Sequence, residues 1–319
     1  MVDASSGVHL WADTYNRSTQ EDLFAIQDDV TNRIVARVAH PSGVLVRSMA
    51  ETLRDRAYDE LTAAELVLCY YVYLEQFKPD EHARLRDALE HAVTREPDHA
   101  EAWAALSRLY EHEHSHGVNP RPHAAERARQ AAERAVEVNR MSQAAWEALT
   151  SVHFFGRDLP ALRAASERAI ALNPLDTAVL AWVGMTLSWA GDWERGVELA
   201  RRAMTYDTYH AGWFYFITSS HLFLLRRFEE ALIEVKRINM PQFQWMHFDT
   251  ATIAGHLGRR ADAQAAVDAL RRINPDLLNV DHARRALEHW YWIDELTELR
   301  LEGLQKALAL ADEVTTRSS

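Results

Sequence analysis

The sequence has few of the residues that cross-link or bend a chain. It contains one cysteine, Cys69, so no internal disulfide is possible, and we expect a buried structural thiol there. Only 11 glycines and 9 prolines occur in 319 residues, which disfavours a fold rich in turns and strands. No run of about 18 apolar residues is present, which argues against a membrane-spanning helix. The first ten residues lack the basic start and apolar core of a secretory signal peptide, so we expect a cytoplasmic chain.

The sequence also contains fewer basic than acidic residues. The 35 basic residues face 47 acidic ones, and the net charge is -12. Binding to a phosphate backbone needs a positive footprint, so we expect no nucleic-acid partner. What dominates instead is alanine, leucine, arginine and glutamate, a composition that favours helices. No glycine-rich phosphate loop and no local Ser/His/Asp pattern is present, so we predict neither a cofactor nor an enzyme.

Similar residues recur 34 positions apart around Pro174. Trp146 corresponds to Leu180, and Ala169 corresponds to Ala203. Self-similarity at this period is typical of the tetratricopeptide repeat, in which each unit is a pair of antiparallel helices. One such unit cannot bury its own apolar face, so stacked neighbours must supply the core. The chain resembles tetratricopeptide-repeat proteins over about 60–290, and the resemblance implies an all-α, right-handed superhelix, an α-solenoid.

The repeat spacing divides the chain into four expected parts. These are a strand-plus-helix segment at 1–43, a linker at 44–60, the repeats at 61–275, and capping helices with a tail at 276–319. Helices are expected at 61–77, 79–96, 100–113, 122–138, 281–289 and 294–311. About nine residues around 114–120 exceed the period and predict an inserted loop. The charge of 295–312 suits the polar end cap that a repeat array needs.

The start of the chain has a different pattern. Residues 8–15 partly alternate and favour a β-strand, and an amphipathic helix should follow at 21–39. The motifs Asp3-Ala-Ser-Ser-Gly7, Leu10-Trp11-Ala12 and Asp22-Leu-Phe24-Ala-Ile-Gln27-Asp28 resemble the end of a TolB-amino-terminal-like domain. In bacterial proteins that domain commonly joins such repeats to a class III adenylate/guanylate cyclase or a winged-helix head. The resemblance implies the carboxy-terminal repeat region of such a signalling protein, without its catalytic domain. We expect a truncated or degenerate relative.

One short motif has the spacing of a zinc hydrolase. His112-Glu113-His114-Ser115-His116 matches the HExxH pattern, in which two histidines bind zinc and the glutamate activates water. Gly117 and Pro120 follow at once, so the two outer histidines need not share a helical face. We interpret the stretch as a solvated polar loop. His112, His114 and His116 remain the candidates for the alternative function, a metal-dependent hydrolase.

The favoured site is a groove. In the repeat family the first helix of each pair lines the concave face, at about the second, fifth, ninth, twelfth and thirteenth places of each unit. We call these the groove places. The large apolar residues there are Phe154, Phe155, Met185, Trp189, Trp213, Phe216, Phe223, Trp245 and Phe248. Apolar surface of this kind binds helical or extended peptides. The alternative is a core stripe, formed if the superhelix closes tightly or if the groove is filled by residues 1–40 or by the terminal helix.

The sequence therefore predicts a non-catalytic scaffold. Its partner would be a protein or peptide held in the groove, and its place would be the regulatory part of a cyclase-type signalling protein. A third possibility is self-assembly, with the strand at 8–15 pairing between chains into a homo-oligomer.

Overall fold

The computed structural model describes residues 44–207 and 210–315. All regular structure in these ranges is helical, which confirms the all-α prediction. The predicted strand at 8–15, the helix at 21–39 and the TolB-like resemblance lie outside the described residues and stay predictions. No helix in the described ranges is both long enough and apolar enough to cross a membrane.

The chain forms two compact units. Of the described residues, unit 1 comprises 44–180 and 205–207, and unit 2 comprises 181–204 and 210–315. The division therefore falls inside the predicted repeat array, whose boundaries at 61 and 275 stay predictions. The division passes through helix α9 (Thr177–Trp189).

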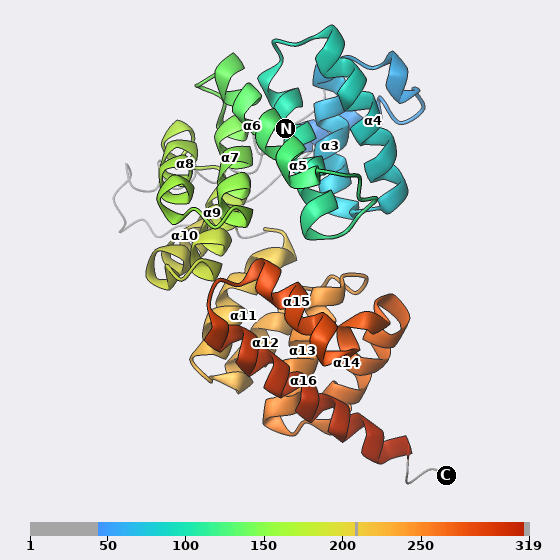
Figure 1. Ribbon diagram of the computed structural model, residues 1–319, viewed down its shortest axis with the longest axis vertical. Helices are drawn as coiled ribbons and strands as arrows, with labels where there is room; N and C mark the ends of the chain where they lie inside the picture. The colour runs from blue at the N-terminus through green and yellow to red at the C-terminus, as the bar shows by residue number, and fades with distance from the viewer. Residues whose placement is uncertain (1–43, 208–209, 316–319) are drawn as a thin grey trace, which may run out of the picture. The chain divides into compact units, whose positions relative to one another are not determined.

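Unit 1 consists of helical pairs (Figure 1). Its elements are α2 (Val44–Glu51), η1 (Tyr58–Glu60), α3 (Ala63–Gln76), α4 (Pro79–Arg95), α5 (Ala100–Ser115), α6 (Ala124–Val138), α7 (Gln143–Phe155) and α8 (Leu159–Leu172). Helices α3, α5 and α7 are the first members of three pairs, and α5 packs against both of the others. The expected linker at 44–60 contains α2 and η1, which pack on α3 and α4.

The helices of unit 1 begin where the sequence supplies caps. Thr62 and Glu65 form a reciprocal capping box at α3, and Ser142 accepts a hydrogen bond from the Ala145 amide at α7. The indole of Trp103 donates to the carbonyl six residues earlier, over 2.9 Å, and Trp146 does the same one repeat later. Equivalent places of successive repeats therefore make the same contact.

Unit 2 continues the pattern after α9. Its elements are α10 (Trp193–Tyr206), η2 (Gly212–Phe214), α11 (Tyr215–Leu224), α12 (Phe228–Arg237), α13 (Gln244–Leu257), α14 (Arg260–Ile273), η3 (Pro275–Leu278), α15 (Val280–Trp290) and α16 (Asp294–Thr315). The ring of His247 donates to the Pro241 carbonyl over 2.9 Å, again six residues earlier. His247 thus replaces the tryptophan at this place of the repeat.

Two glycines let the helices of one repeat approach closely. A Cβ atom on Gly184 of α9 would lie 2.7 Å from the Gly196 carbonyl oxygen of α10. Real Cβ atoms are essentially never found that close to another atom, so a side chain at Gly184 would force the two helices apart. Small residues at these two places belong to the repeat pattern.

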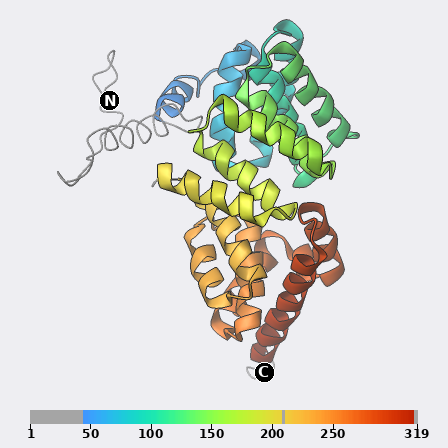
Figure 2. The same cartoon turned by 90° about the vertical axis from the view of Figure 1, so that its left-hand side faces the viewer.

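The C-terminal helix packs through an apolar face. The polar end cap that the charges of 295–312 predict stays a prediction, and one face of α16 is apolar and buried. The residues on that face are Leu296, Leu299, Leu304, Ala307 and Ala311. In Figures 1 and 2, α16 (dark red) runs beside the orange helices of unit 2, and it packs against both α13 and α14.

Candidate partner-binding surface

The nine predicted groove residues divide by exposure. Phe155, Trp213 and Trp245 are half-buried and keep some exposed surface. The other six are buried: Phe154, Met185, Trp189, Phe216, Phe223 and Phe248. A side chain with almost no exposed surface cannot contact a partner, so these six belong to the core rather than to an open groove.

In unit 2, α16 lies on the groove places of α13. A Cβ atom on Gly255, at the twelfth place of its repeat, would overlap the carbonyl oxygen of Gly303 in α16. A Cβ atom on Gly303 would in turn overlap the carbonyl oxygen of Thr252, at the ninth place. His256, at the thirteenth place, donates from Nε2 to the Leu299 carbonyl over 2.8 Å. Backbone-to-backbone contact of this kind leaves no room for a partner along this part of α13.

Arg300 of α16 extends the contact to α11. Its side chain is fully buried, and its Nη2 donates to Ser220 Oγ over 2.9 Å. Its guanidinium also forms an ion pair with the carboxylate of Asp249 and lies 5.0 Å from the centre of the Phe223 ring. Ser220 and Phe223 occupy the ninth and twelfth places of their repeat. Burial raises the pKa of Asp249, and the charge of Arg300 opposes that shift.

The residues before α16 cover Trp189. The rings of Trp290 and Tyr291 meet the Trp189 ring edge-on, with centres 5.5 and 5.3 Å away. The Trp292 amide donates to the Trp189 carbonyl over 2.9 Å. The segment from Trp290 through α16 therefore covers groove places of three repeats in unit 2. The structure thus has the filled groove that the sequence left open as an alternative.

The groove places of unit 1 carry polar side chains. Tyr71, Arg108 and Ser151 hold the ninth place of α3, α5 and α7. Arg108 donates from Nη1 to Ser151 Oγ and, over 2.6 Å, to Glu111 Oε2, so neighbouring repeats are linked along this row. Glu147, at the fifth place of α7, is half-buried. Burial raises its pKa, which Arg108 opposes and the carboxylates of Asp176 and Glu111 reinforce.

Sequence reasoning missed these polar residues because it named only the apolar groove places. The same place rule applied to α5 gives Arg108 at the ninth and Glu111 at the twelfth place. Applied to α7, it gives Glu147 and Ser151. The rule offers no means of finding Arg300, since that residue reaches the groove from a helix outside the repeats.

The HExxH motif forms the end of a helix, with residues 112–115 in α5 and His116 as the C-cap. Helix α5 continues to Ser115, and His112 and Glu113 are buried, which corrects the solvated-loop interpretation. The ring of His112 is 3.2 Å from the Tyr73 hydroxyl, and burial lowers the pKa of His112 well below its usual value. His114 is exposed, and the His116 ring lies 5.8 Å from that of His112. In the described ranges no three His, Cys, Asp or Glu side chains are grouped so that they could hold a metal ion.

Glu113 is held in a structural network, which argues against the hydrolase alternative. Its Oε1 accepts from Arg86 Nη1 over 2.9 Å, and its Oε2 accepts from Arg127 Nη2 over 2.5 Å. The Arg121 amide of the inserted loop also donates to Oε2 over 2.9 Å. Both carboxylate oxygens are thus occupied by donors of the protein itself, which leaves Glu113 poorly placed to activate a water molecule. The network instead fastens the loop to α4 and α6.

Replacing Glu113 by glutamine is therefore expected to destabilise unit 1. Arg86 would lose its buried counter-charge, and breaking a buried ion pair in this way costs about 3–5 kcal/mol. Urea unfolding followed by circular dichroism measures the change. Glu133→Gln is the matched control, because Glu133 forms an exposed pair with Arg129 worth at most about 1 kcal/mol. Equal stability of the two variants would contradict the structural role of Glu113.

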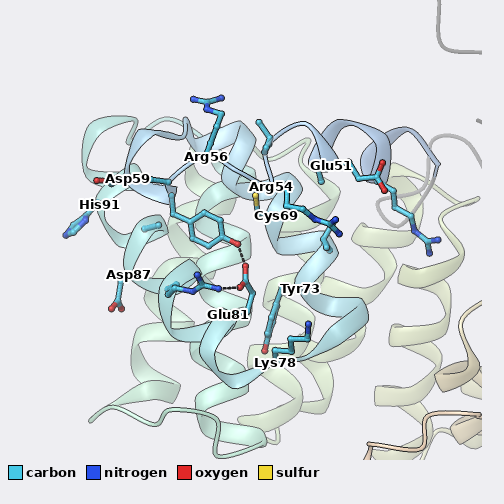
Figure 3. Close-up of a pocket in the computed structure, with 18 residues that line it drawn as sticks. Glu51, Arg54, Arg56, Asp59, Cys69, Tyr73, Lys78, Glu81, Asp87 and His91 are labelled. Carbon is cyan, nitrogen blue, oxygen red and sulfur yellow. Dashed lines mark hydrogen bonds and ion pairs between the residues drawn. The ribbon is translucent and has the colours of Figure 1, made fainter. Parts of the chain in front are cut away.

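A cavity of about 890 Å³ opens between α2, α3 and α4 (Figure 3). Within it, the Glu81 carboxylate accepts hydrogen bonds from Tyr58 and Arg84. Cys69 lies on the wall and is half-buried, and burial raises its pKa to about 11. The thiol is thus protonated at neutral pH and poorly reactive, in keeping with a structural role.

Comparison with known proteins supports the class of fold and gives little information on function. No known family model matches the chain. A stretch of 110 residues, 34% of this chain, is 34% identical to "Putative adenylate cyclase 3" of Rhizobium meliloti (strain 1021). That stretch spans 18% of the relative, so most of the relative's length has no counterpart here.

Solved structures define the class of fold. A chain of the APC/C hetero-tetramer Cut9–Hcn1 superimposes with a TM-score of 0.57, covering 81% of this chain and 48% of that one at 13% identity. A tetratricopeptide repeat protein from Parabacteroides merdae ATCC 43184 covers 77% of this chain and 98% of its own, with a TM-score of 0.43 and 13% identity. Together with the stacked helical pairs, the superposition on the Cut9–Hcn1 chain supports an all-α helical-repeat solenoid, the fold that the period of 34 residues predicts.

Proposed function

We propose that this chain is a non-catalytic scaffold that binds a partner protein on the groove places of unit 1. The observation that carries the proposal is the difference between the two units. In unit 2 the groove places are taken by α16. Among the described residues of unit 1, no helix lies across α3, α5 and α7 in that way. Repeat arrays bind their partners on this face, and Tyr71, Glu147 and Phe155 are half-buried there.

One of the nine predicted groove residues lies on this face of unit 1 and keeps some exposed surface. Phe155 lies at the end of α7, where its ring meets those of Phe154 and His114 edge-on. Trp213 and Trp245 belong to unit 2 and have no part in the proposal. Partly exposed aromatic rings of this kind commonly supply the dominant contacts of an interface.

The sequence match supports a place in signalling. The relative that shares the 110-residue stretch is described as a putative adenylate cyclase. We propose that this chain acts as a regulatory part of a cyclase-type protein, in which the repeats recruit a partner.

The test uses the purified chain as bait and mass spectrometry to identify a captured partner, whose affinity is then measured by calorimetry. Phe155→Ala should weaken binding at least about tenfold, as expected for an aromatic anchor. Ile233→Ala is the control, because Ile233 is apolar and 63% exposed but lies on α12, a second helix of its pair. Circular dichroism must show that both variants stay folded. The proposal fails if no partner is captured, or if both variants bind it as tightly as the unmodified chain.

A further inference from the structure

The cavity between α2, α3 and α4 is large enough to hold a small molecule. Its volume of about 890 Å³ falls within the usual range of ligand sites, and such sites commonly lie between packed helices. Helix α3 lines it with Cys69, Val72 and Tyr73. Tyr71, which holds the groove place of the same helix, is not part of the lining. The cavity is therefore distinct from the partner-binding face proposed above.

One part of the cavity wall is apolar. Leu53, which follows α2, is buried, as are Tyr73 of α3 and Ala88 of α4. Val72 also lines the cavity and is half-buried. Apolar atoms of a ligand gain free energy when they leave water for a wall of this kind. The wall therefore favours a ligand with an apolar body.

The rest of the lining is charged and carries more cations than carboxylates. Its basic side chains are Arg47, Arg54, Arg56, Lys78 and Arg84, and its acidic side chains are Glu51, Asp59, Glu81 and Asp87. The Glu81 carboxylate is bound by Arg84. Asp87 pairs with Arg86 and Arg121, which are not part of the lining. Although the whole chain has a net charge of -12, the cavity has a local excess of positive charge.

Arg54 and Lys78 are the cations best placed to meet an anion in the cavity. Both are exposed; Arg54 follows α2, and Lys78 is the N-cap of α4. In Figure 3 they lie on the same side of the view as the Tyr73 ring, and Asp59 lies on the opposite side. Arg56, by contrast, is held in an ion pair with a glutamate of α3. A guanidinium and an ammonium group together offer charged donors to a carboxylate or a phosphate.

We propose that this cavity binds a small amphipathic anion. Its apolar body lies against Leu53, Val72 and Ala88, and its carboxylate or phosphate is bound by Arg54 and Lys78. Medium-length fatty acids and alkyl phosphates share this chemistry. The inference goes beyond the proposed function, since it gives unit 1 a small-molecule ligand in addition to a protein partner.

The probes are decanoate, decyl phosphate and naphthalene-2-carboxylate, each titrated into the full chain by calorimetry. At least one should bind with a dissociation constant on the order of 100 µM. The first two probes distinguish a carboxylate head from a phosphate head. Decan-1-ol has the same apolar body as decanoate without the charge, and it should bind at least about tenfold more weakly than the best of the three anions.

The double variant Arg54→Gln, Lys78→Gln should weaken binding of the best probe about tenfold, because it removes both charged donors. Both side chains are exposed, so the fold should be unaffected, and circular dichroism checks this. Arg140→Gln is the matched control. Arg140 is an exposed arginine of unit 1 that does not line the cavity, and its exchange should leave the affinity unchanged.

Cys69 shows whether the probe lies in this cavity, because it is the one cysteine of the chain and lines the wall. Burial raises its pKa to about 11, so alkylation by iodoacetamide is followed at about pH 10, where part of the thiol is ionised. A saturating concentration of the best probe should slow this alkylation at least about fivefold, because the probe covers the thiol.

Four results would each overturn the inference. These are binding of all three anions weaker than about 1 mM, equal affinity for decan-1-ol, equal affinity of the double variant and Arg140→Gln, and alkylation of Cys69 at the same rate with and without the probe. None of them bears on the capture of a partner at the groove places, so the proposed function stands or fails separately.

Discussion

Replacing Arg300 by methionine should lower the free energy of unfolding of unit 2 by about 3–5 kcal/mol. Methionine fills much of the same volume but leaves Asp249 buried without its counter-charge and Ser220 without its donor. Removing one member of a buried ion pair costs this much because the remaining charge is isolated from water. Urea unfolding followed by tryptophan fluorescence and circular dichroism measures the loss. We expect it in the transition that reports on Trp290 and Trp292.

A surface ion pair of α16 provides the control for this prediction. Arg284 pairs with Glu298 of α16 at the surface, so Arg284→Met should cost at most about 1 kcal/mol. The double variant Arg300→Met, Asp249→Leu should recover most of the lost stability, because an apolar pair can replace a buried ion pair without cost. If Arg300→Met costs no more than Arg284→Met, the pair does not hold α16 on the groove places.

Introducing leucine at Gly303 should displace α16 from α13. The new side chain would collide with the carbonyl oxygen of Thr252 and with the ring of His256, and neither helix backbone can yield without losing its packing. Overpacking of this kind costs about 1–3 kcal/mol or more. We expect the amides of 296–311 to lose at least about tenfold of their protection in hydrogen exchange, since 1.4 kcal/mol corresponds to that factor.

Ala309→Leu is the matched control for this second prediction, because it adds the same atoms to an exposed face of the same helix. Its exchange pattern should equal that of the unmodified chain. Unchanged protection in Gly303→Leu would mean that α16 does not rest on α13 through this glycine contact.

The helices of this protein were predictable because their determinants are local. The period of 34 residues and the caps at Thr62 and Ser142 predict helix positions with little reference to distant residues. The helices predicted at 79–96 and 281–289 begin and end within one residue of α4 and α15. The insertion between α5 and α6 followed from the same count.

The site was harder to predict, because its contacts join residues that are far apart in the sequence. Arg300 and Ser220 are 80 residues apart, and no periodic pattern connects them. The charges of α16 predict a polar end cap, but the helices on which its leucines pack, α13 and α14, cannot be inferred from those charges. Phe223 and Phe248 occupy groove places as predicted, but the sequence alone does not show what covers them. Glu111 and Glu147 were accessible to the place rule, and the search for apolar residues passed over them.

The central claim is that the partner-binding face is that of unit 1, while the corresponding face of unit 2 is filled by α16. Hydrogen exchange on the full chain, with and without the captured partner, tests this most directly. The account predicts slower exchange on binding in α3, α5 and α7, and unchanged exchange in α13 and α16. Slower exchange confined to α13, with faster exchange in α16, would show that the partner displaces the C-terminal helix, and it would contradict the account.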